Sequence, residues 1–151
     1  MNSSTFVRKA SLEDLASLLD LVRELAVYEK APEAVTATLQ DYEKNYLEGV
    51  FDALVAVDRE GAIVGTAIYY VCFSTWKGRM LYLEDFVVKE SLRGLGTGRL
   101  LFDALLQEAV NLDCRLVKWQ VLEWNEPALN FYGKYQAIIE KEWWNGKIFV
   151  G

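Results

Sequence analysis

The sequence contains no histidine among its 151 residues. Serine–histidine–aspartate and cysteine–histidine catalysis are therefore excluded, as are most zinc sites. Of the two cysteines, Cys72 and Cys114, neither belongs to a Cys-x-x-Cys pair or shows metal-ligand spacing, so we expect free thiols and no bound metal. Acid–base chemistry on this chain must then depend on carboxylates and tyrosines.

Proline is also scarce, with two residues, and 52% of the chain is apolar, so we expect a folded chain rather than a disordered one. The sequence shows neither an apolar run of membrane-spanning length nor an N-terminal charged-then-apolar segment. A length of 151 residues is typical of one domain. We therefore expect a single domain over residues 1–151 that is cytoplasmic and does not contact a membrane.

Basic residues are outnumbered, because 22 Asp and Glu face 16 Lys and Arg and give a formal net charge of -6. This balance disfavours a broad nucleic-acid surface, which requires clustered Lys and Arg. It is compatible with a small cationic substrate, although many proteins are acidic for solubility alone.

The periodicity of apolar residues predicts an α/β fold with the element order β-α-α-β-β-β-α-β-α-β-β, a mixed sheet with helices on its faces. Ser11 with Asp14 forms a capping-box pattern, and Asn125 with Pro127 is typical of another helix start. Asn145-Gly146 predicts a closing hairpin turn. The predicted strands are 5–10, 53–57, 62–74, 79–89, 116–124, 137–144 and 147–151. The predicted helices are 11–29, 38–49, one that follows the glycines and has Leu101, Leu105, Ala109 and Leu112 on its inner face, and 126–135.

Three glycines, Gly94, Gly96 and Gly98, lie between a predicted strand and a predicted helix and are flanked by Arg93 and Arg99. The start of a helix exposes unpaired N–H groups with a partial positive charge. Where side chains are missing, the oxygens of a phosphate approach these amides directly. The two arginines are expected to add charge-assisted hydrogen bonds, so the segment predicts a phosphate-binding loop.

Other phosphate motifs do not match this loop. A Walker A loop ends in Gly-Lys-Ser/Thr, whereas the sequence here is Gly98-Arg99-Leu100, and a dinucleotide-binding fingerprint needs glycine where Arg99 stands. The catalytic-loop and metal-binding motifs of kinases are absent from the sequence. A flexible connection whose glycines serve only turn geometry remains the alternative interpretation.

Two adjacent acids, Glu84 and Asp85, interrupt an apolar strand in the segment "LYLEDFVV". Because neighbouring residues of a regular strand face opposite sides of the sheet, a cationic partner on one side would not neutralise both carboxylates. Burying carboxylates costs several kcal/mol unless they are paired. Structural ion pairing is one interpretation. The position just before the glycine loop favours the other, a cleft in which an acid accepts protons or holds a cation.

These residues together resemble the GNAT superfamily of acetyl-CoA-dependent N-acetyltransferases. Its R/Q-x-x-G-x-G/A signature matches Arg93, Gly96 and Gly98. Within the superfamily, the chain is most similar to the spermidine/spermine (diamine) and thialysine acetyltransferases. The segments "RELAVYE", "YLEDFVV", "RGLGTG" and "EWNEPALNFY" carry this similarity, which is weakest over 31–50 and after residue 137.

The resemblance implies the GNAT fold, a splayed and mostly antiparallel sheet flanked by helices, with acetyl-CoA as co-substrate. It places the pantetheine arm along the strand backbone and the diphosphate on the amides of the glycine loop, while a short helix start contacts the cofactor from the other side. The implied cofactor-binding residues are Phe86, Val87, Val88, Arg93, Gly94, Leu95, Gly96, Thr97, Gly98, Arg99, Asn125, Glu126, Pro127 and Ala128.

The resemblance also implies catalytic roles for Tyr132, as the acid that protonates the departing CoA thiolate, and for Glu84, as an acid that binds substrate or acts as a base through water. Trp76 is a candidate for an apolar or cation–π wall of a polyamine site, as are Tyr28 and Trp124, although aromatic residues more often serve the core. The full set of candidate substrate-binding residues is Tyr28, Glu29, Trp76, Glu84, Asp85, Lys118, Trp119 and Gln120.

The expected reaction is direct acetyl transfer to a primary amine of a small diamine, polyamine or lysine-like molecule, without a metal. An alkyl ammonium has a pKa near 10.4, so about one molecule in a thousand is neutral at physiological pH and a base is needed. A strand amide released by a β-bulge near Phe86 or Val87 is expected to stabilise the oxyanion. Acetylation of proteins or peptides, or a non-catalytic CoA-binding protein, are the alternatives.

Two features depart from the family pattern. Glycine usually follows the tyrosine by four residues, as in NFYxxxG, but Gln136 occupies that place. We expect Gln136 to leave the helix in a left-handed conformation at some cost in stability. The sequence also stops at Gly151, so we expect no C-terminal tail to reach the site of a partner subunit, although the family resemblance implies a homodimer.

Overall fold

The computed structural model describes residues 5–151, which form two compact units divided after Gln120. The first unit ends at Gln120, and the second unit comprises Val121–Gly151. Each unit is described by itself below. The expectation of a single domain over residues 1–151 stays a prediction.

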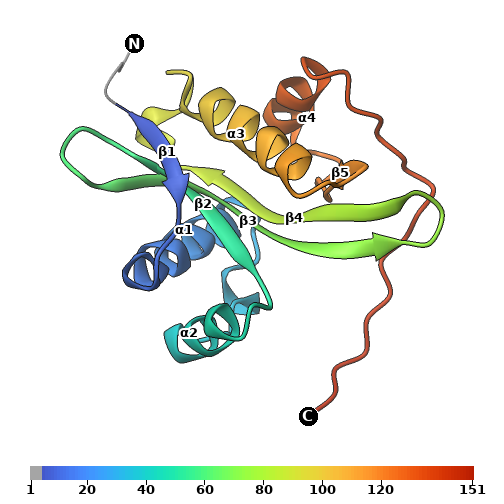
Figure 1. The fold of residues 1–151 in the computed structure, drawn as a ribbon, viewed down its shortest axis with the longest axis horizontal. Helices are drawn as coiled ribbons and strands as arrows, with labels where there is room; N and C mark the ends of the chain where they lie inside the picture. Colours follow the sequence, from blue (N-terminus) through green and yellow to red (C-terminus); the bar gives the residue numbers. More distant parts are fainter. Residues whose placement is uncertain (1–4) are drawn as a thin grey trace. The chain divides into compact units, whose positions relative to one another are not determined.

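The first unit is built on one sheet, which has five strands in the described part of the chain, in the order β1-β2-β3-β4-β5 (Figure 1). The four longer strands, β1 to β4, pair with their neighbours in antiparallel orientation, and β5 pairs with β4 in parallel. The predicted mixed, mostly antiparallel sheet is thus confirmed. The strands are β1 (Phe6–Lys9), β2 (Asp52–Val57), β3 (Ile63–Ser74), β4 (Gly78–Val88) and β5 (Leu116–Lys118).

Helices cover both faces of this sheet: α1 and α2 lie on one face and α3 lies on the other (Figure 1). The core below α1 includes Leu15, Leu18 and Ile68, whereas α3 buries Leu101 and Leu105. The helices of this unit are α1 (Leu15–Tyr28), α2 (Leu39–Leu47) and α3 (Thr97–Asn111), with 3-10 turns at η1 (Leu12–Asp14), η2 (Pro32–Ala34) and η3 (Glu90–Leu92). Among residues 5–151 no helix is both long and apolar enough to span a bilayer.

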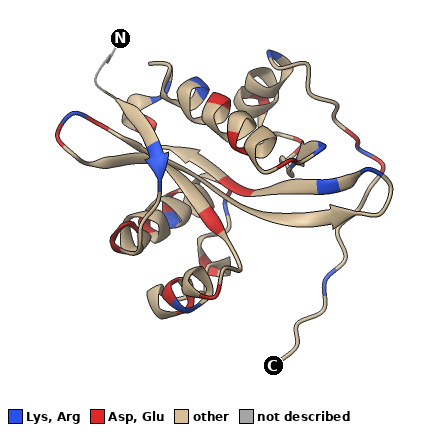
Figure 2. Cartoon of the chain, in the orientation of Figure 1, with Lys and Arg blue, Asp and Glu red and all other residues tan. Residues whose placement is uncertain are grey.

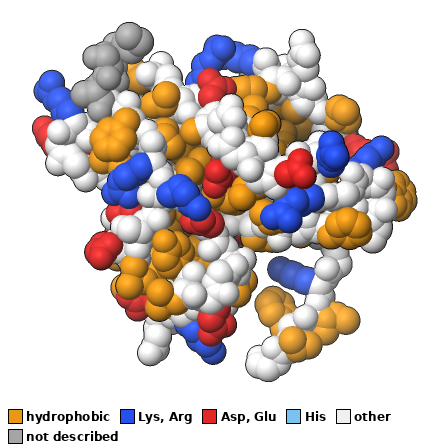
Figure 3. Space-filling model, in the orientation of Figure 1, with side chains coloured by type: hydrophobic (Ala, Val, Ile, Leu, Met, Phe, Trp, Pro, Cys, Tyr) orange, Lys and Arg blue, Asp and Glu red, His pale blue; other side chains and the backbone are white. Residues whose placement is uncertain are grey.

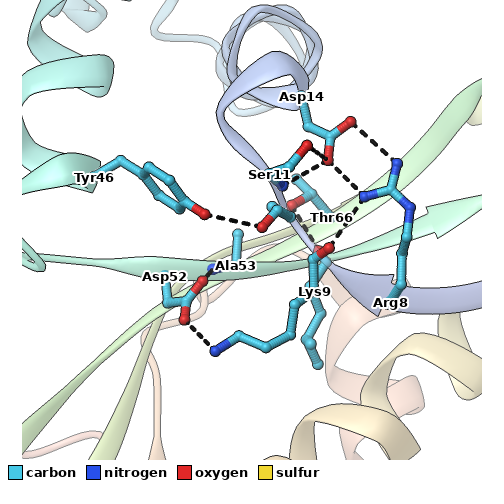
Figure 4. Close-up of polar contacts among 10 residues, drawn as sticks. Arg8, Lys9, Ser11, Asp14, Tyr46, Asp52, Ala53 and Thr66 are labelled. Atoms are coloured by element: carbon cyan, nitrogen blue, oxygen red, sulfur yellow. Dashed lines mark hydrogen bonds and ion pairs between the residues drawn. The ribbon is translucent and has the colours of Figure 1, made fainter.

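Local capping explains where the helices start. The Ser11–Asp14 capping box is present, but it opens the 3-10 turn η1 instead of the helix itself. A second capping box joins Thr38 to Asp41 at the start of α2. The carboxylate of Asp14 also pairs with Arg8 at 2.6 Å (Figure 4), and this hydrogen bond lowers the pKa of Asp14.

The second unit contains α4 (Glu126–Gly133), and its start and exit agree with expectation. Asn125 caps the helix by accepting a hydrogen bond from the Ala128 amide at 3.3 Å, and Pro127 lies in the first turn. Gln136 has φ 59°, the left-handed conformation expected where the family carries glycine.

The predicted closing hairpin is wrong. Residues 137–151, all of which the structure describes, form no strand. Their large apolar side chains are exposed, with Trp144 at 93% and Phe149 at 87%. Figure 3 shows hydrophobic side chains in orange on the surface of the molecule. The Asn145-Gly146 turn signal is local, whereas a hairpin also needs an apolar surface to cover. The predicted strand 116–124 is likewise shorter than expected, since β5 ends at Lys118.

Candidate active site

The glycine loop of the first unit adopts a conformation that side chains disfavour. Gly94 and Gly96 have φ 81° and 87°, in the left-handed region, and α3 starts directly after Gly96. A Cβ atom placed on either glycine would meet no protein atom within 4 Å. The backbone turn therefore requires these two glycines, whereas packing within the protein does not. Their missing side chains leave open space beside the loop.

The backbone amides of this loop are available to an acceptor from outside the protein. Of residues 5–151, none accepts a backbone hydrogen bond from the amides of Gly94 to Arg99, while Leu100 donates to the carbonyl of Gly96 at 3.0 Å. A run of unpaired amides at a helix start fits an anion such as a diphosphate. The loop therefore satisfies the main requirement for holding the diphosphate of acetyl-CoA.

The two arginines of the loop differ in their surroundings. Arg93 donates from Nε to the Val88 carbonyl at 3.3 Å, and its guanidinium lies 5.1 Å from the centre of the Tyr28 ring. Arg99 is exposed and lies 3.9 Å from Asp103, a separation at which an exposed pair contributes little. Arg93 thus links the loop to α1, while Arg99 is available to an anion.

The acidic pair of β4 lies at a β-bulge (red in the middle of β4, Figure 2). Tyr69 pairs with Leu83 and Ile68 pairs with Asp85, so Glu84 is the extra residue of β4. The bulge expected near Phe86 or Val87 therefore lies earlier, at Glu84. It changes the alternation of the strand: Leu83 stays on the α3 side with Tyr69, and Asp85 shares the α1 side with Ile68.

Glu84 reaches the same face as Asp85. Its Oε1 accepts a hydrogen bond from the Tyr70 hydroxyl at 3.4 Å, and Tyr70 lies two residues from Ile68 on that side of β3. Tyr70 stacks on Tyr82 with ring centres 5.4 Å apart. The bulge therefore gathers two carboxylates that a regular strand would place on opposite faces.

Asp85 has the most strongly perturbed carboxyl of this cluster. Burial, followed by the charges of Glu84 and Glu29, raises the pKa of Asp85 from 3.8 to about 6. Burial also raises the pKa of Glu29, which follows α1. A carboxylate with a pKa near 6 is well matched to accept a proton near neutral pH. Sequence reasoning assigned the base to Glu84, and the burial of Asp85 with its raised pKa makes Asp85 a second candidate.

Tyr42 of α2 belongs to the same cluster and was missed from the sequence. Burial and the negative charge of Asp85 raise its pKa to about 12, while the charge of Arg23 acts in the opposite direction. Tyr42 lies in the segment where the family resemblance is weakest, so no motif marked it. The acidic cluster, defined as Glu29, Tyr42, Tyr70, Glu84 and Asp85, therefore draws on α1, α2, β3 and β4.

Some predicted substrate residues lie elsewhere. Trp76 is 82% exposed at the turn between β3 and β4. The seven residue steps of β4 from Gly78 to Asp85 span about 23 Å, so the chain does not bring Trp76 to the acidic cluster. Trp119 packs edge-on against Phe102 of α3, with ring centres 5.7 Å apart. Lys118 lies opposite Tyr82 where β5 ends, and Gln120 is exposed.

The end of β4, just before the glycine loop, has buried side chains and is no longer paired with β5. Phe86 packs edge-on against Phe102 at 5.5 Å, and Val87 and Val88 are buried. Pairing with β5 extends only from Met80 to Tyr82, although β4 continues to Val88. The sheet therefore opens beyond Tyr82, in agreement with the predicted splay, and the strand backbone there is the expected place for the pantetheine arm.

The remaining predicted residues belong to the second unit. Tyr132 is 6% exposed and packs edge-on against Phe131, with ring centres 5.5 Å apart. Asn125 is buried as the cap of α4, and Glu126 and Pro127 form its first turn with Ala128. The assigned roles of these residues stay predictions. Within the described residues there is no group of three or more Cys, Asp or Glu placed to bind a metal ion, and metal independence also stays a prediction.

The fold and the open glycine loop at the start of α3 are those expected of a GNAT acetyltransferase. The sequence matches the Acetyltransferase (GNAT) family over residues 15–137, and the chain belongs to this family. It is an N-acetyltransferase with the GNAT fold, as expected from the sequence.

Individual relatives agree with the suggested subgroup. The chain is 33% identical to a thialysine N-epsilon-acetyltransferase of Bos taurus, covering 96% of this chain and 92% of the relative. It is 31% identical to a spermidine/spermine N(1)-acetyltransferase-like protein 1 of Homo sapiens, covering 87% of this chain but 20% of that protein. An aminoglycoside acetyltransferase from an uncultured soil metagenomic sample shares the fold, with a TM-score of 0.82, 18% identity and 99% of both chains covered.

Proposed function

We propose that this N-acetyltransferase acetylates a primary amine of a small diamine, polyamine or lysine-like molecule. The observation that carries the proposal is the bulge at Glu84, which presents Glu84 and Asp85 on the face that also bears Glu29. Several carboxylates around one site suit a substrate with more than one positive charge. The names of the relatives from Bos taurus and Homo sapiens support the same substrate class.

In the proposed reaction, acetyl-CoA supplies the acetyl thioester when it is bound. The unpaired amides between Gly94 and Arg99 hold its diphosphate, and the strand backbone from Phe86 to Val88 lies along its pantetheine arm. Tyr132 is proposed to give a proton to the departing thiolate. This assignment follows from the family pattern at Tyr132.

Asp85 is proposed to accept the proton that the substrate ammonium must lose. The amine has a pKa near 10.4, far above that of an ordinary aspartate. A rise in the pKa of Asp85 from 3.8 to about 6 narrows this difference by about two units, which corresponds to about 3 kcal/mol. Glu84 and Glu29 then hold the cationic remainder of the substrate.

An amine panel tests the substrate class. With acetyl-CoA present, thiol release is expected with spermidine, short diamines and thialysine, and at least about tenfold lower kcat/KM with monoamines of equal length, since an added charge pairing is worth about 1.4 kcal/mol or more. A lysine-containing peptide and an N-terminal peptide serve as competitors. Faster turnover of either peptide would assign the chain to protein or peptide acetylation, and bound acetyl-CoA without turnover of any amine would make it a non-catalytic CoA-binding protein.

The pH dependence of the reaction follows from the Asp85 carboxyl. Because a base must be ionised, kcat/KM for the amine is expected to fall about tenfold per unit as pH decreases below about 6, the raised pKa of Asp85. Above pH 6, kcat/KM is expected to become independent of pH. Initial rates from pH 4.5 to 8.5 with saturating acetyl-CoA measure this, and an inflection near 4 would contradict the assignment.

A homodimer and a cytoplasmic location belong to the same proposal. The exposed apolar side chains of residues 138–150 support a second copy as the surface that covers them, because apolar side chains gathered in one segment mark an interaction site more often than scattered ones. Light scattering of the purified protein decides the oligomeric state. No nucleic-acid or membrane partner is expected.

A further inference from the structure

The β-bulge at Glu84 brings the acidic cluster together, and it requires an interaction that fixes the register between β3 and β4. If β3 and β4 paired regularly beyond Tyr69 and Leu83, Asp85 would lie opposite Ala67, on the α3 side. That arrangement would also separate Asp85 from the charges of Glu84 and Glu29, which raise its pKa. Electrostatic repulsion therefore acts against the observed register, and some other interaction must stabilise it.

Tyr69, the β3 residue next to the register change, takes part in several polar contacts. The Tyr69 hydroxyl donates a 2.6 Å hydrogen bond to Glu108 of α3, and Tyr69 is only 2% exposed. Lys9 of β1 lies 3.8 Å from the same Glu108 carboxylate and 2.6 Å from Asp52 of β2 (Figure 4 shows the Lys9–Asp52 pair). Asp52 is in turn the β2 residue paired with Tyr69.

These four residues, Lys9, Asp52, Tyr69 and Glu108, form the Tyr69 network. It joins β1, β2, β3 and α3 around one strand position, so Tyr69 is held both through its backbone pairing and through its hydroxyl. The network lies on the α3 side of the sheet, opposite the acidic cluster. Among residues 5–151, no hydrogen bond or ion pair joins its members to Glu29, Glu84 or Asp85.

We propose that Tyr69, held by Glu108, is a positioning residue: it fixes the β3–β4 register beside the bulge and so keeps Asp85 on the face that bears Glu29. The proposal rests on the proposed role of Asp85 in amine acetylation. Loss of the Tyr69–Glu108 hydrogen bond frees the register to shift, which moves Asp85 toward the α3 side and away from Glu84 and Glu29. The glycine loop lies outside β4, so its hold on the diphosphate of acetyl-CoA is expected to persist.

The first test measures the position of Asp85 without turnover. Carboxyl-carbon NMR of the full chain is expected to show Asp85 titrating near 6, and in Tyr69→Phe the midpoint is expected to shift by at least about one unit, because a changed register alters both the burial of Asp85 and its distance from Glu84 and Glu29. The cross-strand contact between Ile68 and Asp85 should weaken in the same variant. An unchanged titration together with an unchanged contact overturns the proposal.

The second test measures catalysis. In Tyr69→Phe, kcat is expected to fall about tenfold or more, since displacing a catalytic group by about 1 Å can cost about a hundredfold, and the Kd for acetyl-CoA is expected to change by a smaller factor because the glycine loop is intact. Glu108→Ala should behave alike, and Glu108→Gln, which keeps an acceptor for the Tyr69 hydroxyl, should restore kcat. Equal activity of Glu108→Ala and Glu108→Gln contradicts the positioning role.

Tyr46→Phe is the matched control, because it also removes a half-buried hydroxyl, one that donates to the Ala10 carbonyl at 3.0 Å. It should leave the Asp85 titration and kcat unchanged. If Asp85 proves not to be the base, the NMR result still decides the positioning role, so the two proposals fail separately. The groups that act on Asp85 are Glu29, Glu84 and Tyr42, while Arg23 acts on Tyr42 and Tyr70 donates to Glu84. All of these groups stay intact in the variants.

Discussion

Replacing Asp85 by asparagine is expected to lower kcat for amine acetylation by about 10²- to 10⁴-fold, the usual contribution of a positioned base. Asparagine has nearly the same shape but does not accept the proton of the ammonium. The Kd for acetyl-CoA should remain that of the unchanged protein, because the glycine loop is intact. Steady-state kinetics with the best amine of the panel and calorimetry with acetyl-CoA measure the two quantities.

The same substitution is expected to stabilise the fold. The folded pKa of Asp85 is about 6, above its unfolded value, so its ionised form destabilises the native state. The penalty is absent below the unfolded pKa, grows as pH rises from about 3.9 to about 6, and is complete above 6, where it amounts to about 2–3 kcal/mol. Asp85→Asn should therefore raise Tm at pH 7.5 but have little effect on Tm at pH 3.5.

These opposite effects on activity and stability separate a catalytic role from misfolding. Asp113→Asn is the control, since it removes the same charge at an exposed position in the left-handed conformation, which asparagine tolerates. It should alter neither kcat nor Tm appreciably. If Asp85→Asn kept kcat within about threefold of the unchanged protein, Asp85 would not be the base, and Glu84 would return as the candidate.

Local signals account for the parts of the structure that could be predicted. The capping box at Ser11, the Asn125 cap and the glycine loop each act within a few residues, and each appears near its predicted place. The left-handed conformation of Gln136 is local too, because a helix exit at that position leaves few alternatives.

Interactions between distant segments account for the parts that could not. The shared face of Glu84 and Asp85 depends on a bulge, and the position of that bulge depends on how β4 pairs with β3. Tyr42 joins the acidic cluster only through the packing of α2, and Arg93 lies over Tyr28, an α1 residue far away in sequence. The closing hairpin was predicted wrongly because an alternating pattern and a turn do not specify the surface that a strand covers.

Replacing Gly96 by valine is expected to raise the Kd for acetyl-CoA at least about a hundredfold. Gly96 has φ 87°, and a Cβ atom at this position would meet no protein atom within 4 Å, so the protein itself has room for the side chain. The bound diphosphate would instead meet it, and two or more charge-assisted amide hydrogen bonds, each worth about 1.5–3 kcal/mol, would be lost. Calorimetry with acetyl-CoA measures the effect.

Backbone strain must be separated from this loss of contacts. A non-glycine residue in the left-handed region costs about 1–3 kcal/mol, so Gly96→Val should also lower the free energy of unfolding. Gly61→Val provides the matched control, because Gly61 has φ 85° with equal space around it but lies in the turn between β2 and β3. Both variants should lose similar stability in urea unfolding, whereas only Gly96→Val should lose affinity. An equal Kd in the two variants would mean that the amides between Gly94 and Arg99 do not hold the diphosphate.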